Sequence, residues 1–417
     1  MKKIIIKIIY HIYAFLARIY IRKTKPIVIG VTGSVGKTSC RMIIFQVLNQ
    51  FLPERKIYTS PKNFNSELGL VFSIFKIEKY DPGVLSLIKI FFFLLKKTFI
   101  GKKEYDVLLL EYGVDHPNDM DFLLKIVKPD YSVFTKLDFI HVANFSSKKQ
   151  IGEEKIKLIK NTKIKAYLNK QDEFLNEISD KLLVENQFFN KKNAYKHKYI
   201  CEDKKILSLL QIDNSIIKTN IMGEDNFVYL ELALSILKNF GVNYLPVGTY
   251  INLVNQPGRF SLFNGIKNSV LIDSTYNAGP ASMLKMIQNT VYLRDSVFKN
   301  YHILFVIGDM RELGVKSRQE HRRLYHYLNA YGKIISIGKE TRDNFGEHLG
   351  SFKFASDAGL FLKDYLENSN KKYIILFKGS QNTIFTEEAL KQVLLDPRNA
   401  KKLVRQDDYW LKNKSNY

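Results

Sequence analysis

The stretch GSVGKT, residues 33–38, contains the residue types that bind a nucleotide phosphate. Its glycines permit a tight turn whose backbone N–H groups point inward at phosphate oxygens. We expect Lys37 to neutralise the β and γ phosphates and Thr38 to offer its hydroxyl to Mg²⁺. The common pattern has its first glycine where this chain has Val31, with glycine instead at positions 30 and 33. The stretch is therefore a variant phosphate-binding loop, and the alternative is a glycine-rich turn with a chance Lys-Thr pair.

Three charged or titratable residues further along the chain could act beside this loop. Glu111 ends a predicted buried strand, where a lone carboxylate is costly unless it meets a cation. His141 follows another predicted strand, in LDFIHVANF, and Lys155 lies in IGEEKIKLI. Each also has an ordinary interpretation, as a strand-end acid, a loop histidine satisfied by its neighbours, and a solvated helix lysine. Taken singly, these residues leave both interpretations open.

The segments that would position these residues alternate between strand and helix. From Pro26 the β-branched run IVIGV precedes the glycine loop, and SCRMIIFQVLNQFL after it has helical spacing. DVLLLEYG, PNDMDFLLKIVK and DYSVFTKLD continue as strand, helix and strand. This alternation predicts an α/β fold with a mostly parallel sheet and helices on both faces. Because ligands bind at the carboxyl ends of such strands, the loop, Glu111 and Thr135 are expected to share one edge.

The length of 417 residues predicts two or three domains. The best boundary is NQPGRF, around Pro257, because strand and helix alternation restarts after it with SVLIDS, ILFVIGDM, KIISIG and YIILFKGS. We expect an amphipathic basic helix over residues 1–25, a P-loop-containing ATP-binding domain over 26–255 and a Rossmann-like α/β domain over 256–417. The last has no glycine-loop lysine of its own, which favours a role in delivering a substrate.

Two segments, residues 1–24 and 85–100, are both apolar and basic. Read as a helix, the first has an apolar side with Ile5, Ile8, Ile12, Phe15, Leu16 and Ile19 and a basic side with Lys3, Lys7, His11 and Arg18. The second has an apolar stretch too short to cross a bilayer, with lysines on its flank. Both could lie on a membrane surface, and packing against this protein or a partner is the alternative.

The formal net charge is +23, from 64 Lys and Arg against 41 Asp and Glu. Nucleic acid is not indicated as a partner, because the lysines are scattered and no motif for binding RNA or DNA is present. Solvated faces, anionic substrates and an anionic membrane surface remain to explain the excess. The two cysteines, Cys40 and Cys201, are far apart, which indicates neither a disulfide nor a zinc site and fits a reducing cytoplasm.

Ten blocks in a fixed order resemble those of the Mur ligase family. They are GVTGSVGKTS, PKNFNSELGL, EYGVDHPNDM, FIHVANFSSKKQIGEEK, LNKQDE, QPGRF, IDSTYNAGPASM, VIGDMRELG, the histidine at 321 and FKGSQ. The resemblance runs from about residue 25 to about residue 392. Chance assembly of ten ordered blocks is negligible, and YNAGPASM and GDMRELG are the most selective of them.

The resemblance implies ATP-dependent amide ligation in the cytoplasmic synthesis of peptidoglycan precursors. An acceptor carboxylate is activated as an acyl phosphate and then joined to D-alanyl-D-alanine or a related amine, the acceptor being a muramoyl-peptide-like molecule. Two alternatives stay open. One keeps the chemistry but takes an acceptor without UDP or one presented at a membrane, and the other is a nucleotide-binding Mur-like protein without ligase activity.

Roles of single residues follow from the resemblance by motif position. Lys37 clamps phosphate, while Thr38, Glu111 and His141 hold Mg²⁺. Lys155 matches the family lysine that CO₂ converts to a carbamate, an anion able to support a second Mg²⁺, so the implied catalytic residues are Lys37, His141 and Lys155. The implied ATP-binding set is Gly33, Ser34, Gly36, Lys37, Thr38, Ser39, Arg259, Asp273 and Asn277, and the residues facing the acceptor are Asn63 and Asn65.

The sequence departs from the family pattern at several points. Only about twenty-five residues precede the first strand, where relatives carry a domain that holds the UDP-sugar. In GEDNFVY, Asp225 stands where histidine is usual, and Tyr229 replaces an adenine-contacting asparagine. Adenine is therefore expected to be held in a different way, for example by stacking on Tyr229. Ser274 and Gln381 stand where aspartate and arginine are common. Without the cationic fork of an arginine at position 381, an amine that carries a carboxylate is not expected to be bound there in the usual way.

Overall fold

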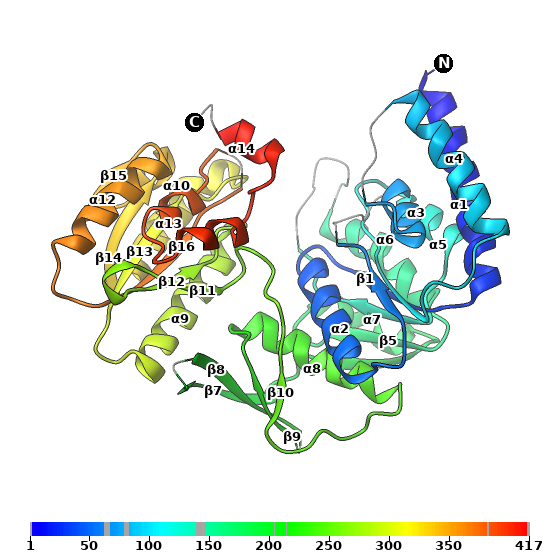
Figure 1. The fold of residues 1–417 in the computed structure, drawn as a ribbon, viewed down its shortest axis with the longest axis horizontal. Helices are drawn as coiled ribbons and strands as arrows, with labels where there is room; N and C mark the ends of the chain where they lie inside the picture. Colours follow the sequence, from blue (N-terminus) through cyan, green and yellow to red (C-terminus); the bar gives the residue numbers. More distant parts are fainter. Residues whose placement is uncertain are drawn as a thin grey trace. The chain divides into compact units, whose positions relative to one another are not determined.

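The computed structural model describes residues 2–61, 67–78, 83–138, 145, 147–203, 205–213, 215–381 and 383–414. The chain forms two compact units (Figure 1). Unit 1 comprises Met1–Lys196, Gln211–Ile217 and Asp225–Ile251, and unit 2 comprises His197–Leu210, Lys218–Glu224 and Asn252–Tyr417.

Unit 1 is built on a six-stranded sheet in the order β2-β3-β1-β4-β5-β6, in which every pair of neighbours is parallel. The strands are β1 (Ile27–Thr32), β2 (Ile57–Thr59), β3 (Val107–Glu111), β4 (Tyr131–Phe134), β5 (Lys165–Asn169) and β6 (Glu185–Phe189). The central strands are apolar along their length and buried, because helices cover both faces of a parallel sheet. The predicted α/β fold with a mostly parallel sheet is confirmed.

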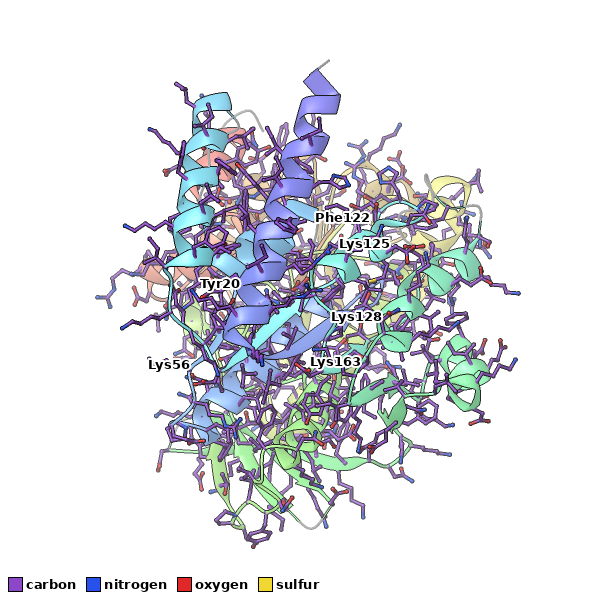
Figure 2. All side chains as sticks on the ribbon, turned by 90° about the vertical axis from the view of Figure 1, so that its right-hand side faces the viewer. Tyr20, Lys56, Phe122, Lys125, Lys128 and Lys163 are labelled. Atoms are coloured by element: carbon purple, nitrogen blue, oxygen red, sulfur yellow. The ribbon has the colours of Figure 1, made fainter. Side chains whose placement is uncertain are left out.

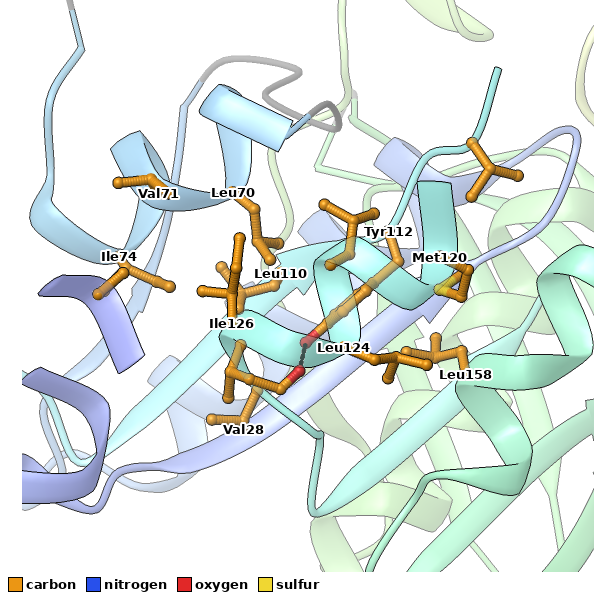
Figure 3. Close-up of a cluster of buried hydrophobic side chains, with 14 of the residues drawn as sticks. Val28, Leu70, Val71, Ile74, Leu110, Tyr112, Met120, Leu124, Ile126 and Leu158 are labelled. Atoms are coloured by element: carbon orange, nitrogen blue, oxygen red, sulfur yellow. Dashed lines mark hydrogen bonds between the residues drawn. The ribbon is translucent and has the colours of Figure 1, made fainter. Parts of the chain in front are cut away.

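The helices packed around this sheet are α1 (Lys2–Thr24), α2 (Lys37–Phe51), α3 (Glu67–Phe75), α4 (Val84–Phe99), α5 (Asp119–Ile126), α6 (Lys148–Lys160) and α7 (Glu173–Ile178). One continuous core joins β1 and β3 to the helices α3, α5 and α6 (Figure 3). Within it Tyr112 is fully buried, and its hydroxyl donates to the carbonyl of Val127 at 3.0 Å. This bond ties the end of β3 to the end of α5, so the strand that carries Glu111 is held firmly.

Helix α1 packs into unit 1 through its tyrosine and alanine side. Tyr13, Ala17 and Tyr20 are buried, and the hydroxyls of the two tyrosines donate to the carbonyls of Leu87 and Lys102. By contrast, Ile8, Ile12 and Phe15, which the sequence places on the apolar side, are exposed. The reason is that the small alanine allows close packing while each tyrosine buries a ring and still satisfies its hydroxyl.

A four-stranded sheet follows along the chain, in the order β10-β9-β8-β7. Its strands are β7 (Tyr195–Glu202), β8 (Lys205–Ile212), β9 (Ser215–Thr219) and β10 (Thr249–Ile251), and the helix α8 (Glu224–Lys238) lies between β9 and β10 in sequence. The lysine- and asparagine-rich stretch around residues 190–220, in which no clear pattern is visible, is thus a meander of short strands.

Unit 2 contains a second six-stranded sheet, in the order β11-β12-β16-β13-β14-β15, in which β11 is antiparallel to β12. Its strands are β11 (Ser261–Asn264), β12 (Val270–Asp273), β13 (His302–Gly308), β14 (Gly332–Ile337), β15 (Gly350–Phe352) and β16 (Tyr373–Lys378). Its helices are α9 (Pro280–Val297), α10 (Ser317–Asn329), α11 (Lys339–Asn344), α12 (Ala355–Glu367), α13 (Glu387–Lys391) and α14 (Asp408–Lys414). Within the described part of the chain, no helix is long and apolar enough to cross a membrane.

Candidate functional site

The phosphate-binding loop connects β1 to α2 and depends on its two glycines. Gly36 caps α2 with a φ of 85°, a left-handed conformation that favours glycine. A Cβ at Gly36 would lie 1.8 Å from the hydroxyl oxygen of Tyr229, and one at Gly33 would lie 2.0 Å from Oγ1 of Thr135. The loop therefore tolerates no side chain at either position. Tyr229 contacts the loop itself at Gly36.

Residues that follow β4 hold this loop in shape. Ser34 donates its N–H to the carbonyl of Lys136 at 2.7 Å and its hydroxyl to the carbonyl of Asp138 at 2.9 Å. The hydroxyl of Thr135 donates to the carbonyl of Val35 at 2.6 Å. The Nζ of Lys37 donates to the carbonyl of Gly33 at 2.8 Å, so the ammonium lies over the turn that would hold phosphate. The glycine loop and Thr135 thus lie together at the carboxyl ends of β1 and β4, as expected.

Glu111 ends β3 as a buried carboxylate, 3% exposed, and it does meet a cation. Its Oε1 lies 2.8 Å from the Nε of Arg41, and its Oε2 accepts a long hydrogen bond of 3.4 Å from the hydroxyl of Thr38. One oxygen is therefore neutralised by arginine while the other faces the threonine of the loop. The parallel register of β1 and β3, which pairs Val31 with Glu111, places the carboxylate beside the loop.

Arg41 is a site residue that sequence reasoning missed. It lies one helical turn after Thr38 on α2 and is almost completely buried. Its Nη1 donates to Oγ1 of Thr59 and, at 2.6 Å, to the carbonyl of Ser60, immediately before the segment that contains Asn63 and Asn65. The sequence does contain an indication of this role. An arginine within the apolar run CRMIIFQVL is unusual unless it pairs with a buried acidic residue.

Lys155 lies on α6 and is 3% exposed, so the interpretation as a solvated helix lysine is wrong. Burial, and after it the positive charge of Lys37, lower its pKa from 10.5 to about 7, although the carboxylates of Asp115, Glu154 and Asp119 partly oppose this shift. Helix α6 packs against β1 and β4, so Lys155 is buried against the strand that leads into the phosphate-binding loop. A buried lysine whose pKa is near 7 is partly a neutral amine at physiological pH, which is the nucleophilic form.

Three of the expected site residues, Asn63, Asn65 and His141, lie outside the described residues. Among the residues that the structure does describe, no group of three His, Cys, Asp or Glu side chains is arranged to hold a metal ion. Oε2 of Glu111 and the hydroxyl of Thr38 face one another beside the loop and are oxygen atoms that could bind a cation there.

The other expected contact residues, Arg259, Asp273 and Asn277, gather in unit 2 at the carboxyl ends of β12 and β16. Asp273 accepts from the N–H groups of Gly258 and Thr275, both at 3.1 Å, and so fixes the turn that carries Arg259. The guanidinium of Arg259 lies 4.4 Å from the ring centroid of Tyr276. These contacts hold the QPGRF and IDSTYN blocks against one another.

The FKGSQ block, at the end of β16, holds the loop that contains Asn277 in place. The Nζ of Lys378 donates to the carbonyl of Asn277 at 2.7 Å, and Oδ1 of Asn277 accepts from the N–H of Gln381 at 3.5 Å. Lys378 is buried, so its charge stabilises the loop after β12 from within.

The histidine at 321 has a structural role. It is completely buried on α10, where its Nε2 accepts from the N–H of Met310 at 3.0 Å and its Nδ1 lies 2.8 Å from the carbonyl of Ser317. It thereby shapes the loop of the GDMRELG block. In the same block Oδ1 of Asp309 accepts from the N–H of Thr341 at 2.8 Å. Packing and hydrogen bonding account for His321, whereas Oδ2 of the buried Asp309 has no hydrogen-bond partner among the residues that the structure describes.

A pH-dependent stability is expected from Asp273. Burial raises the pKa of this carboxyl from 3.8 to about 6, although hydrogen bonds from Thr275 partly oppose the effect. Because the folded-state pKa exceeds the unfolded one, this stabilisation is complete below about pH 4 and is lost as the pH rises through 6. The stability of the wild type relative to Asp273→Asn should therefore fall by up to about 3 kcal/mol between pH 4 and pH 7.

Urea unfolding of both proteins across this range measures that difference in the free energy of unfolding. The matched control is Asp357→Asn, an exposed aspartate on α12, whose difference from the wild type should stay constant with pH. A difference for Asp273→Asn that is equally large at pH 4 and pH 7 would contradict the expectation.

Comparison with known proteins agrees with this arrangement. Residues 31–235 match the family model of the Mur ligase middle domain. The resemblance to the Mur ligase family seen in the sequence blocks is therefore confirmed over this part of the chain.

Among individual proteins, the chain is similar to UDP-N-acetylmuramoyl-tripeptide–D-alanyl-D-alanine ligase of Bacillus subtilis, with 25% identity over 407 residues, 92% of this chain and 79% of the relative. The enzyme of the same name from Haemophilus influenzae is 24% identical over 380 residues, 86% of this chain and 75% of the relative. The fold is similar to the crystal structure of MurF ligase from Thermotoga maritima in complex with ADP, with a TM-score of 0.72 and 22% identity over 92% of this chain and 83% of that one.

Proposed function

We propose that this protein is an ATP-dependent ligase that forms an amide bond in the synthesis of peptidoglycan precursors. The observation that supports this most strongly is the convergence of Lys37, Thr38, Glu111 and Lys155 in unit 1. These residues come from α2, β3 and α6, and they place a phosphate clamp, a buried carboxylate and a buried lysine beside one loop. A protein that only bound a nucleotide would have little use for the buried lysine.

In the proposed reaction Lys37 and the loop N–H groups hold the phosphates of ATP. The acceptor carboxylate attacks the γ-phosphorus, which forms an acyl phosphate and releases ADP. The amine then attacks the acyl carbon, an amide bond forms, and phosphate leaves. The chain's part in these steps is to orient both reactants and to offset the charge of the transferring phosphoryl group.

The residues present fit the Mg²⁺ that such a reaction uses. Thr38 and Glu111 would hold it, because the hydroxyl and Oε2 are 3.4 Å apart while Arg41 occupies the other carboxylate oxygen. His141 joins this set by motif position, and a carbamate on Lys155 would support a second ion. When bound, the metal neutralises charge on the phosphates.

The proposed acceptor is a UDP-muramoyl tripeptide and the proposed amine is D-alanyl-D-alanine, the substrates in the names of the relatives. We assign ATP binding to the domain of residues 26–255. The domain of residues 256–417 is assigned the additional nucleotide contacts, made by Arg259, Asp273 and Asn277. Asn63 and Asn65 face the acceptor. The location that follows from these substrates is the cytoplasm.

A second candidate keeps the same chemistry but takes an acceptor that lacks UDP or is presented at a membrane. Gln381 favours it, because the amide at this position offers no cationic fork for the carboxylate of a dipeptide amine. The exposed apolar and basic face described in the next subsection favours it as well.

The test is ATP turnover over a panel of UDP-muramoyl peptides crossed with amino acids and dipeptides, read by the mass of the amide product. ADP release that needs both a carboxylate and an amine is expected. Product with UDP-muramoyl tripeptide and D-alanyl-D-alanine supports the first candidate, whereas ADP release without any amide product contradicts both.

Lys37→Ala is expected to lower turnover at least ~10²-fold, because the phosphates lose their clamp. Lys136→Ala is the matched control, since Lys136 is exposed and holds the loop only through its backbone carbonyl. Its turnover should stay within about twofold of the wild type. Equal losses in both variants would contradict the role of Lys37.

A further inference from the structure

Helices α1 and α4 form a parallel pair on one side of unit 1. The Nζ of Lys23 donates to the carbonyls of Phe99 at 2.8 Å and Gly101 at 3.1 Å, and so closes the end of α4. Figure 1 shows the two helices side by side, and Figure 2 shows their N-terminal ends extending beyond the sheet of unit 1. Their C-terminal halves are anchored, since Tyr20 and Leu94 are buried.

The outward side of this pair is apolar. The α1–α4 face is defined here by exposed side chains that are between 40% and 76% accessible: Ile8, Ile12 and Phe15 of α1, and Leu85, Ile88, Phe92, Phe93, Phe99 and Ile100 at α4. Single exposed apolar residues are ordinary, but a run of isoleucine, leucine and phenylalanine on two adjacent helices marks an interaction surface.

The two helices are also strongly basic. Helix α1 carries six Lys and Arg residues and α4 carries three, while neither contains an Asp or a Glu. Of the three on α4, Lys97 pairs with Glu104, which follows the helix. The first acidic residue of the whole chain is Glu54. On α4 the exposed Lys89 and Lys96 alternate at helical spacing with Phe93 and Ile100, so basic and apolar side chains share one stripe.

Further positive charge lies beside this face. Lys125 and Lys128, at the end of α5, are exposed on the side of unit 1 that carries α1 (Figure 2). Helix α5 also contacts α1 directly, through the edge-to-face pair of Phe122 and His11. The basic surface therefore extends past the two helices.

This combination identifies the kind of partner. Helices with apolar side chains beside lysines, and with no acid of their own, are typical of those that lie in the interface of an anionic bilayer, where lysine stems reach back to the headgroups. A second copy of the same face would bring like charges together, which disfavours a dimer. The helices lie on the bilayer without crossing it, since leaving unit 1 would expose Tyr13 and Tyr20.

We propose that the α1–α4 face binds the surface of an anionic membrane and holds unit 1 there. The inference does not depend on the proposed ligase reaction, because it concerns a surface that carries none of the expected catalytic residues. If both hold, the acceptor is met at the membrane surface.

The test is cosedimentation of the full chain with vesicles, in the absence of substrates. Binding is expected with mixed phosphatidylglycerol and phosphatidylcholine vesicles, little binding with phosphatidylcholine alone, and weaker binding as salt increases. Wild-type protein that stays in the supernatant with anionic vesicles overturns the proposal.

Two double variants separate the apolar from the electrostatic contribution. Leu85→Ser with Phe92→Ser, and Lys89→Glu with Lys96→Glu, should each weaken binding at least ~10-fold. The control is Leu183→Ser with Val315→Ser, which removes two fully exposed apolar side chains elsewhere and should bind like the wild type. Thermal unfolding checks that all variants are folded, and unchanged ligation in solution separates this result from the proposed function.

Two outcomes with these variants count against the proposal. Vesicle binding that neither double variant weakens would place the contact elsewhere on the chain. The other is a dimer that light scattering detects for the wild type but not for the double variant Leu85→Ser with Phe92→Ser. This result would mean that the face binds a second copy of the chain. Deleting residues 1–24 is a poor substitute for these changes, because it also removes Tyr13, Ala17 and Tyr20 from the core.

Discussion

Lys155→Ala is expected to lower the rate of ligation by at least ~10²–10³-fold while the protein stays folded. The reason is the proposed carbamate. The ammonium of Lys155 first loses a proton to solvent. The neutral amine then adds to CO₂, an N–C bond forms and a second proton passes to solvent, which leaves a buried anion able to support a metal ion. The measurement is ADP release with acceptor and amine present, together with mass analysis of the amide product.

Lys155→Arg distinguishes this role from a requirement for positive charge. Arginine keeps the charge but cannot form the carbamate, so this variant should be as inactive as the alanine variant. Lys160→Ala on the same helix is the matched control, since Lys160 is exposed and should keep its rate within about twofold. An active Lys155→Arg protein would exclude the carbamate, and a ¹³C signal from labelled bicarbonate in the wild type only would support it.

Arg41→Met is expected to lower the free energy of unfolding of unit 1 by about 3–5 kcal/mol. The substitution leaves Glu111 buried without its cation, because the nearest remaining donor is the long contact from Thr38. It also removes the hydrogen bonds to Thr59 and Ser60. Urea unfolding followed by a probe in unit 1 measures the loss.

Removing both charges tests the explanation. The double variant Arg41→Met with Glu111→Leu should regain most of the lost stability, since an apolar pair replaces a broken ion pair. Arg55→Met is the control, because Arg55 forms an exposed pair with Glu54 at 3.8 Å and lies 5.2 Å from the ring centroid of Phe240, so its loss should change stability by no more than about 1 kcal/mol. A double variant as unstable as Arg41→Met would show that the arginine stabilises unit 1 by other contacts.

Arg41→Lys separates stability from metal binding. Lysine keeps a cation beside Oε1 of Glu111 but cannot reach Thr59 and Ser60 at the same time. We expect a smaller loss of stability and a higher Mg²⁺ concentration for half-maximal turnover, because Oε2 is then held less firmly toward Thr38. An unchanged Mg²⁺ dependence would limit Arg41 to a structural role.

The parts of the site that could be predicted from the sequence are those that depend on local pattern. Gly33, Gly36 and Lys37 lie within five residues of one another. The positive φ angles at the two glycines and the close approach of other atoms to them are therefore requirements that the local sequence reveals. Glu111 is recognisable because it ends an apolar strand. The alternation of strands and helices indicates a parallel sheet, since only crossover connections can join such strands.

The parts that could not be predicted depend on partners far away in the chain. Arg41 and Glu111 are seventy residues apart, and the pairing of β1 with β3 is what brings them within 2.8 Å. Lys155 lies among charged residues and looks solvated in the sequence. Only the packing of α6 against β1 and β4 buries it.

By itself, the sequence determined the phosphate loop, the parallel α/β fold and the order of the family blocks, because these follow from short-range spacing. Only the tertiary structure decided which charges are paired and which faces are open. The clearest case is α1, where tyrosine and alanine face the core while Ile8, Ile12 and Phe15 face outward beside α4. Hydrophobicity alone cannot distinguish a buried apolar side from an exposed one, because burial depends on what packs against it.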